Sequence, residues 1–385
     1  MVEVASSAKN MAAAFFAPSI TVAELQTKYV QASRFRTPKV RILIVPGHEP
    51  DFGGTAFGGV NERDVVVDVA QELAKFFENN SRYDVIVARG KESWNPEIQA
   101  YFDANEQAIK DFVSTQKTLM QEHIHEGDLA AVSNGIKHNK APSKVAFHLY
   151  GINKWANEND VDITLHLHFN DHPRKNTRIP GVYEGFAIYV PESQFSNAIA
   201  THAVAENIRK RLLKYNNQST FGKESAGIIE SQDLIAIGSY NTAESASMLI
   251  EYAYIYEPKV QNANVRDMVM KDFAFHTYLG IQDFFGSGND VNFLFDTVSL
   301  PYAWTKPLGT EPSIDTYALQ IALANAGYYP GKSSFIDCPI TGRFGPCTKA
   351  ALTQFQKDSG ITGESGILGE KTRELMNQVF GVQAL

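Results

Sequence analysis

Residues 39–89 read KVRILIVPGHEPDFGGTAFGGVNERDVVVDVAQELAKFFENNSRYDVIVAR. The first seven of them include five apolar residues and run into Pro-Gly, which predicts a buried strand. Residues 61–79 place apolar side chains at helical spacing behind Asn61, a suitable cap, and residues 83–89 predict a second strand. Strand, helix and strand in this order are typical of a βαβ unit. The chain is therefore predicted to be α/β, with a mixed, mostly parallel sheet flanked by helices.

The same reading extends this α/β domain over residues 38–285. Further strands are predicted at 162–170, 185–190 and 247–255, and further helices at 147–160, 194–215 and 265–285. Residues 91–147 interrupt the alternation and are interpreted as an insertion. Its first part, residues 95–126, predicts one long polar helix, and HIHEGD at the end of that helix (residues 123–128) is interpreted as solvated.

The two ends of the chain differ from this domain. Residues 1–37 weakly resemble a secretory signal and are interpreted as the remnant of a signal or an anchor. Residues 286–311 are rich in glycine, proline and serine, which predicts a linker. Residues 312–382 hold three helical stretches between glycine-rich turns, so we expect a small all-α domain there.

Composition limits the classes of function. The 385 residues are 44% hydrophobic and 20% charged, which is typical of a globular protein, and the net charge of −8 argues against nucleic acid as a partner. No apolar run reaches the roughly 18–20 residues that span a bilayer. Cys338 and Cys347 lie nine residues apart, which predicts a disulfide and an extracytoplasmic location, with two free thiols as the alternative.

Four side chains are placed where a parallel sheet would bring them to one edge. His48 follows the first strand, Glu62 begins the next helix, and His168 ends a later strand. A catalytic zinc ion commonly takes three such ligands. Glu251, in a late strand, is a candidate general base. His166 points to the same face of its strand as His168, so either histidine is open as a ligand, and His166 alternatively lies beside the site or shapes a substrate groove.

These residues resemble the zinc-dependent N-acetylmuramoyl-L-alanine amidases of the type-3 group. The matching pieces, in the order of that family, are Gly47-His48, Glu62-Arg63, His168-Phe169-Asn170 and Glu251 within MLIEYAY. The resemblance implies a phosphorylase/hydrolase-like fold for residues 38–285. It also implies that His48, Glu62 and His168 bind Zn²⁺ and that Glu251 is the catalytic glutamate.

The chain departs from the family at several points. Glu49 stands where a second glycine is usual, and Tyr252-Ala253 stand where Gly-Phe is usual. The insertion at 91–147 is longer than the family core requires, and we hypothesise that it covers the active site as a lid. These departures bear on substrate selectivity and access, because none of them removes a ligand.

The C-terminal stretch resembles the helical peptidoglycan-binding domain of cell-wall hydrolases. The matching pieces are Leu319-Gln320, Gly327-Tyr328-Tyr329, Gly342-Arg343-Phe344-Gly345 with Thr348, Phe355-Gln356, and Gly369 with Thr372. Most of these residues form turns or core, so the motif assigns no binding residues.

Together the two resemblances predict a cell-wall hydrolase that cleaves the amide between N-acetylmuramic acid and L-alanine in peptidoglycan. A secreted, periplasmic or cell-wall-associated location follows. The alternatives are a zinc peptidase that cuts within the stem peptide, and a catalytically inactive wall-binding protein. The sequence leaves open the oligomeric state, the stem-peptide type, and whether the enzyme is a phage lysin, an autolysin or a spore enzyme.

Overall fold

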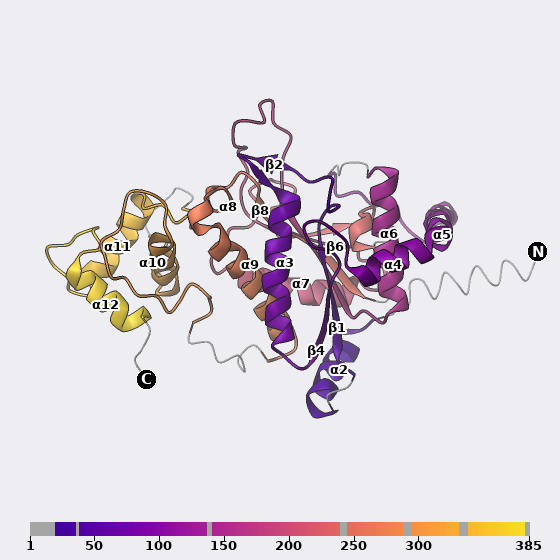
Figure 1. Ribbon diagram of the computed structural model, residues 1–385, viewed down its shortest axis with the longest axis horizontal. Helices are drawn as coiled ribbons and strands as arrows, with labels where there is room; N and C mark the ends of the chain where they lie inside the picture. Colours follow the sequence, from indigo (N-terminus) through magenta and orange to yellow (C-terminus); the bar gives the residue numbers. More distant parts are fainter. Residues whose placement is uncertain are drawn as a thin grey trace, which may run out of the picture.

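The computed structural model describes residues 20–35, 38–136, 141–238, 245–287, 295–330 and 338–381. Within these ranges six strands form one sheet in the order β4-β1-β5-β8-β6-β7 (Figure 1). Neighbouring strands are parallel except β6 and β8, which confirms the predicted mixed, mostly parallel sheet. The strands are β1 (Val40–Pro46), β4 (Tyr83–Val87), β5 (Ile163–Asn170), β6 (Ala187–Pro191), β7 (Ile228–Ser231) and β8 (Ala246–Tyr254).

Helices cover both faces of this sheet. One face packs against α3 (Glu62–Glu78), α7 (Ala198–Leu212) and α9 (Ala263–Phe284). The other packs against α6 (Ser143–Glu158) and the short helix η1 (Ile235–Ile237). The predicted apolar stripe of α3 is confirmed, because Val66, Val69, Leu73 and Phe77 are fully buried. A short hairpin, β2 (Ala56–Phe57) and β3 (Val60–Asn61), precedes α3 and lies beside the N-terminal end of that helix (Figure 1).

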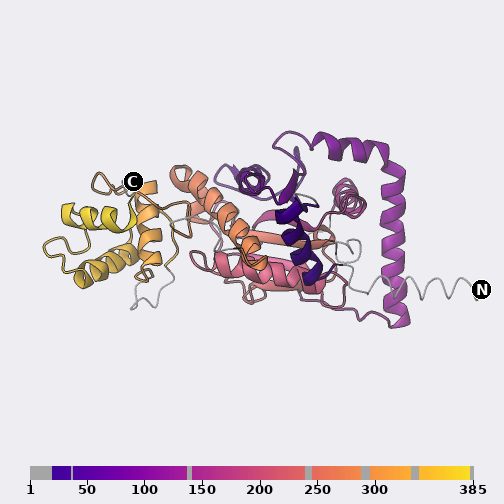
Figure 2. The ribbon, with the colours of Figure 1, turned by 90° about the horizontal axis from the view of Figure 1, so that it is seen from below.

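The prediction of one continuous helix over residues 95–126 is wrong. The segment forms α4 (Pro96–Ala104) and α5 (Glu106–Glu126), which run in different directions (Figure 2). Asn105 separates them, and its side chain donates to the carbonyl of Tyr101 over 2.9 Å. Asparagine is unfavourable within a helix because its side chain competes for backbone hydrogen-bonding groups in this way. Both helices pack against α6.

A helix outside the predicted α/β domain joins its core. Helix α2 (Val22–Phe35) buries Leu25 and Tyr29, and the Tyr29 hydroxyl donates to Gln282 of α9 over 2.9 Å. Lys28 also forms an ion pair with Asp162 over 2.6 Å. Part of the predicted N-terminal segment therefore belongs to the packed fold. The interpretation of the first 19 residues as a signal or anchor remnant lies outside the described residues.

The C-terminal domain holds three helices within the described residues, as predicted. They are α10 (Ile314–Asn325), α11 (Pro346–Asp358) and α12 (Glu370–Phe380). Cys338 and Cys347 form a disulfide, which confirms that prediction. Helix α10 packs against α9, and α8 (Pro258–Gln261) leads into α9 at this side of the sheet (Figure 1).

Part of the stretch predicted as a linker is packed, although most of residues 305–311 are exposed. Trp304 is 2% exposed, and its indole nitrogen donates to the carbonyl of Asp315 over 2.9 Å. The backbone nitrogen of Trp304 donates to Asn377 over 2.8 Å, so this stretch bridges α10 and α12. Among the described helices none is both long and apolar enough to cross a membrane.

Candidate metal centre and active site

The first predicted ligand, His48, lies in the turn that leaves β1. The backbone nitrogen of Gly47 donates to the carbonyl of Leu167 over 2.9 Å, which holds this turn beside β5. His48 itself has a φ of 70°, in the left-handed region that a residue with a side chain rarely adopts. Such a conformation persists only where the surroundings hold it, as at many functional sites.

Arg89, two residues after β4, contacts the same turn with its side chain. It is 1% exposed, and its guanidinium donates to the carbonyls of Pro46 (3.1 Å), Gly47 and Arg63 (3.0 Å). Burial lowers the pKa of Arg89 to about 10, although nearby carboxylates oppose this shift, so the side chain stays charged at neutral pH. Sequence reasoning missed Arg89, because its partners lie far away along the chain.

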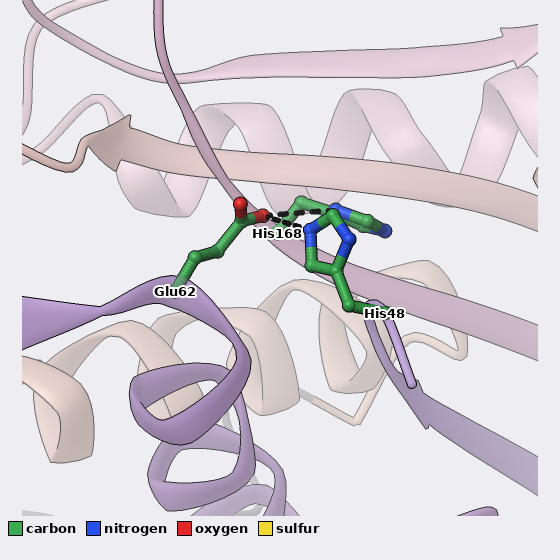
Figure 3. A group of neighbouring side chains, drawn as sticks. All are labelled: His48, Glu62 and His168. Atoms are coloured by element: carbon green, nitrogen blue, oxygen red, sulfur yellow. Dashed lines mark hydrogen bonds and ion pairs between the residues drawn. The ribbon is translucent and has the colours of Figure 1, made fainter. Parts of the chain in front are cut away.

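Glu62, the first residue of α3, faces both histidines (Figure 3). Its Oε1 lies 2.8 Å from Nε2 of His48 and 3.0 Å from Nδ1 of His168, and it accepts the backbone nitrogen of Phe169 over 3.0 Å. Its Oε2 accepts the backbone nitrogen of Thr55 over 2.9 Å. Burial alone would raise the pKa of Glu62. The two histidines outweigh burial and hold that pKa well below its usual range.

The three predicted ligands fit a metal ion. One ligand atom each from His48, Glu62 and His168 lies within 4.8 Å of the others. Among the described residues, the buried Nε2 of His48 has no hydrogen-bond partner, although it lies close to the Glu62 carboxylate. Burial lowers the pKa of His168, with the Glu62 carboxylate opposing, so its imidazole is neutral as a metal ligand requires. Two imidazoles and one carboxylate are a donor set that zinc accepts.

Glycine is required where these groups meet. A Cβ atom on Gly47 would lie 2.3 Å from Cε1 of the His168 ring, far inside contact distance. Gly54 has a φ of 82°, and a Cβ atom there would lie 3.1 Å from Cδ2 of His48. The two histidines can therefore approach each other closely only because Gly47 and Gly54 have no Cβ atom.

Glu251 lies in β8, in register with His168 on the adjacent strand β5. Its Oε2 atom is inaccessible to solvent and has no hydrogen-bond partner among the described residues. Burial, and then the charges of Glu62 and Glu224, raise the pKa of Glu251 well above its usual value. A carboxyl oxygen that is buried without a partner is costly to fold and is typical of a functional position.

Glu224 organises a buried network next to Glu251 that sequence reasoning missed. It is 3% exposed and accepts hydrogen bonds from four side chains. The donors are Asn170 Nδ2 (3.0 Å), Ser219 Oγ (2.5 Å), the Tyr189 hydroxyl (2.6 Å) and the Tyr254 hydroxyl (3.0 Å). These donors come from separate segments, so no local pattern could have indicated the network.

Other histidines that the sequence singled out lie elsewhere. His166 precedes His168 by two residues on β5. It is fully buried and is not part of the converging group. Burial, helped by His168, lowers its pKa to about 3, so this ring is neutral. His123 is also buried, which contradicts its interpretation as part of a solvated helix end. It converges with Glu126 and Asp128, but both carboxylates are exposed, and such groups are common without an ion.

Comparisons with known proteins agree with this geometry. Residues 42–283 match the family model described as N-acetylmuramoyl-L-alanine amidase, and residues 313–376 match a peptidoglycan binding domain. A search among curated proteins found no match.

Solved structures of amidases match part of this chain. The CwlD amidase of Clostridioides difficile, in complex with the GerS lipoprotein, is 14% identical with a TM-score of 0.42, covering 64% of this chain and 99% of its own. The amidase Ami1 of Mycobacterium smegmatis is 14% identical with a TM-score of 0.41, covering 65% and 100%. The catalytic domain of CwlV from Paenibacillus polymyxa is 14% identical with a TM-score of 0.37, covering 66% and 100%.

Proposed function

The chain belongs to the N-acetylmuramoyl-L-alanine amidase family, which is zinc-dependent, and we propose that His48, Glu62 and His168 bind the zinc and that Glu251 is the catalytic base. The protein acts on peptidoglycan as an amidase. The observation that carries the assignment of residues is the convergence of the three side chains at one edge of the sheet, within the matched segment.

The chain supplies ligands in the protonation state that a metal requires. The low pKa of Glu62 keeps its carboxylate ionised throughout the neutral range. The lowered pKa of His168 keeps that ring neutral, and neutral imidazole is the ligating form. Zinc, when bound, acts as a Lewis acid for the scissile carbonyl and lowers the pKa of water to about 7.

Glu251 carries the proton in this proposal. Its carboxylate accepts a proton from the attacking water, and it returns that proton to the amino group of L-alanine as the amide carbon–nitrogen bond breaks. Its raised pKa suits a group that must both take up and release a proton. A nearby divalent cation would bring that pKa down towards neutrality, because positive charge favours the ionised carboxylate. The Glu224 network holds the Asn170 side chain beside the site.

The C-terminal domain binds peptidoglycan. In our proposal it keeps the catalytic domain near an insoluble substrate, which raises the local concentration without demanding strong intrinsic affinity. The disulfide and the wall substrate are consistent with a place outside the cytoplasm. We propose that the enzyme is secreted, periplasmic or attached to the cell wall.

The test combines metal analysis with product analysis. We expect about one zinc per chain in the purified protein, and less than a tenth of that in Glu62→Ala and His168→Ala. A chelator should stop the release of peptide from purified wall, and added zinc should restore it. The released peptides should carry L-alanine at a free amino end. Cuts within the stem peptide would instead indicate a peptidase, and intact wall would indicate a binding protein.

A further inference from the structure

The residue after His48 contacts a helix that the zinc chemistry does not use. Glu49 is 2% exposed, and both of its carboxylate oxygens lie near Nδ1 of His148 in α6, at 2.7 and 2.9 Å. Since a carboxylate only accepts, the Nδ1–H group of His148 is the donor. The backbone nitrogen of Glu49 also donates to the carbonyl of Phe52 over 3.0 Å, which closes the turn.

The His148 ring is itself held in place by aromatic neighbours. It stacks on Phe102 of α4, with ring centroids 4.8 Å apart, and the ring of Trp94 meets it edge-on at 5.2 Å. The backbone of Trp94 forms an isolated β-bridge with that of Arg89, whose guanidinium donates to the turn at Pro46. The partner of Glu49 is therefore packed among aromatic rings of the α4–α6 region.

Two anchors thus flank the strained residue. Arg89 and the carbonyl of Leu167 hold Gly47, and His148 holds Glu49. Between them His48 keeps a φ of 70°, a strained conformation for a residue with a side chain. Losing either anchor would let the turn relax, and the imidazole of His48 would then move away from Glu62.

We propose that the Glu49–His148 pair is a positioning element that ties the metal-binding turn to α6. Through it, the packing of α4 and α6 sets how tightly His48, Glu62 and His168 hold zinc. This inference depends on the proposed zinc site. It also gives α4, which lies in the insertion, a role in supporting the metal centre, because Phe102 stacks on His148.

The test is a double-mutant cycle read out as zinc affinity in the folded protein. Glu49→Gln weakens the acceptor, His148→Phe removes the donor while keeping a ring to stack on Phe102, and the third variant combines both. Competition with a coloured chelator gives the dissociation constant for zinc, and circular dichroism checks the fold. We expect each single change to raise that constant roughly tenfold, and the double change to add little beyond the larger single effect.

Tyr101→Phe is the matched control. The Tyr101 hydroxyl of α4 bonds Glu158 of α6, so its loss perturbs the same pair of helices away from the turn. We expect this variant to bind zinc as the parent protein does. Saturating zinc should restore most of the turnover of Glu49→Gln, because the fold and Glu251 are intact.

The outcomes separate the inference from the proposed function. A parent protein that binds no zinc contradicts the proposed site itself. If the parent binds zinc and folded Glu49→Gln and His148→Phe bind it equally well, only the positioning role is overturned. Additive single effects, or an equal loss in Tyr101→Phe, would also overturn it, because either result means general loosening.

Discussion

Gln356 in the C-terminal domain is a buried polar side chain and Glu251 in the α/β domain is a half-buried one, and their surroundings differ. Gln356 uses its whole amide: it donates to the carbonyls of Glu364 and Ile367 over 2.8 and 2.7 Å, and accepts the backbone nitrogen of Gly366 over 2.7 Å. The inner oxygen of Glu251 has no partner among the described residues.

The same contrast extends to their neighbours. Gln320 of α10 donates to Thr348 over 2.8 Å and accepts the backbone nitrogens of Thr341 and Gly342 over 3.0 and 2.8 Å. Nε2 of His48, beside the proposed ligands, has no hydrogen bond among the described residues, although it lies 2.8 Å from the Glu62 carboxylate. A buried polar group whose hydrogen bonds are all made stabilises a fold. A buried polar group that lacks a hydrogen bond destabilises the fold, and it remains free to bind a ligand. The C-terminal domain satisfies these buried polar groups, whereas the sheet edge leaves polar atoms open to the ion and the substrate that we propose.

The largest effect should come from removing the ligand that joins the two histidines. We expect Glu62→Gln to lower turnover by on the order of 10³ or more, with loss of bound zinc. The pKa of Glu62 is lowered from 4.5, so its contribution to stability is present above that value and is lost as pH falls below it. Glu62 should therefore stay ionised from pH 7 to pH 4, and zinc retention measured over this range should not fall because of its protonation. Full activity in Glu62→Gln would show that the edge is only a polar cluster.

The second effect should separate catalysis from metal binding. Glu251→Gln should lower turnover about 10²–10⁴-fold while zinc stays bound. The raised pKa of Glu251 means that the metal-free parent loses stability as pH rises from 4.5 through the folded-state pKa. The glutamine variant avoids this loss and should be more stable by about 1–3 kcal/mol at pH 8, with little difference at pH 4. Chemical denaturation at both pH values measures this, and a less stable variant at pH 8 would contradict the contrast.

The third effect should fall on the other region. Gln356→Leu leaves two carbonyls and the nitrogen of Gly366 without their buried partner, so the C-terminal domain should lose about 2–4 kcal/mol of stability. Wall binding should weaken, while turnover of a small soluble substrate should stay the same. Gln354→Leu in the same helix is the control. That side chain is exposed and bonds only Asp358 among the contacts seen here, so we expect less than about 0.5 kcal/mol. Equal losses in both variants would remove the difference.

The smallest effect compares the starts of two helices. Ser313 caps α10 by accepting the backbone nitrogen of Thr316 over 3.2 Å, and Ser313→Ala should cost about 1 kcal/mol. Asn61 stands at the cap position of α3, but its side chain donates to Asp64 over 3.0 Å and accepts no backbone nitrogen among the described residues. Asn61→Ala should therefore cost less than half as much in thermal unfolding. A loss as large as that of Ser313→Ala would show that the expected cap does form in solution.

Much of the fold followed from periodicity along the chain. The apolar run before Pro46 and the helical stripe from Val65 to Phe77 correspond to β1 and α3. The short strand β7 and the hairpin of β2 and β3 were missed, because strands of two to four residues leave almost no periodic signal. The break at Asn105 was missed as well, because one asparagine changes the helical pattern very little.

The sequence by itself determined the α/β layers, the helical C-terminal domain and, through a family pattern of separate short motifs, the residues expected to bind zinc. Only the tertiary structure showed that His48, Glu62 and His168 converge, and that Arg89, Glu224 and the Glu49–His148 pair support the edge. The reason is physical. Local periodicity reports which face of a strand or helix is buried, whereas a contact between distant residues, such as Arg89 with Gly47 or Glu62 with His168, depends on how the finished layers pack.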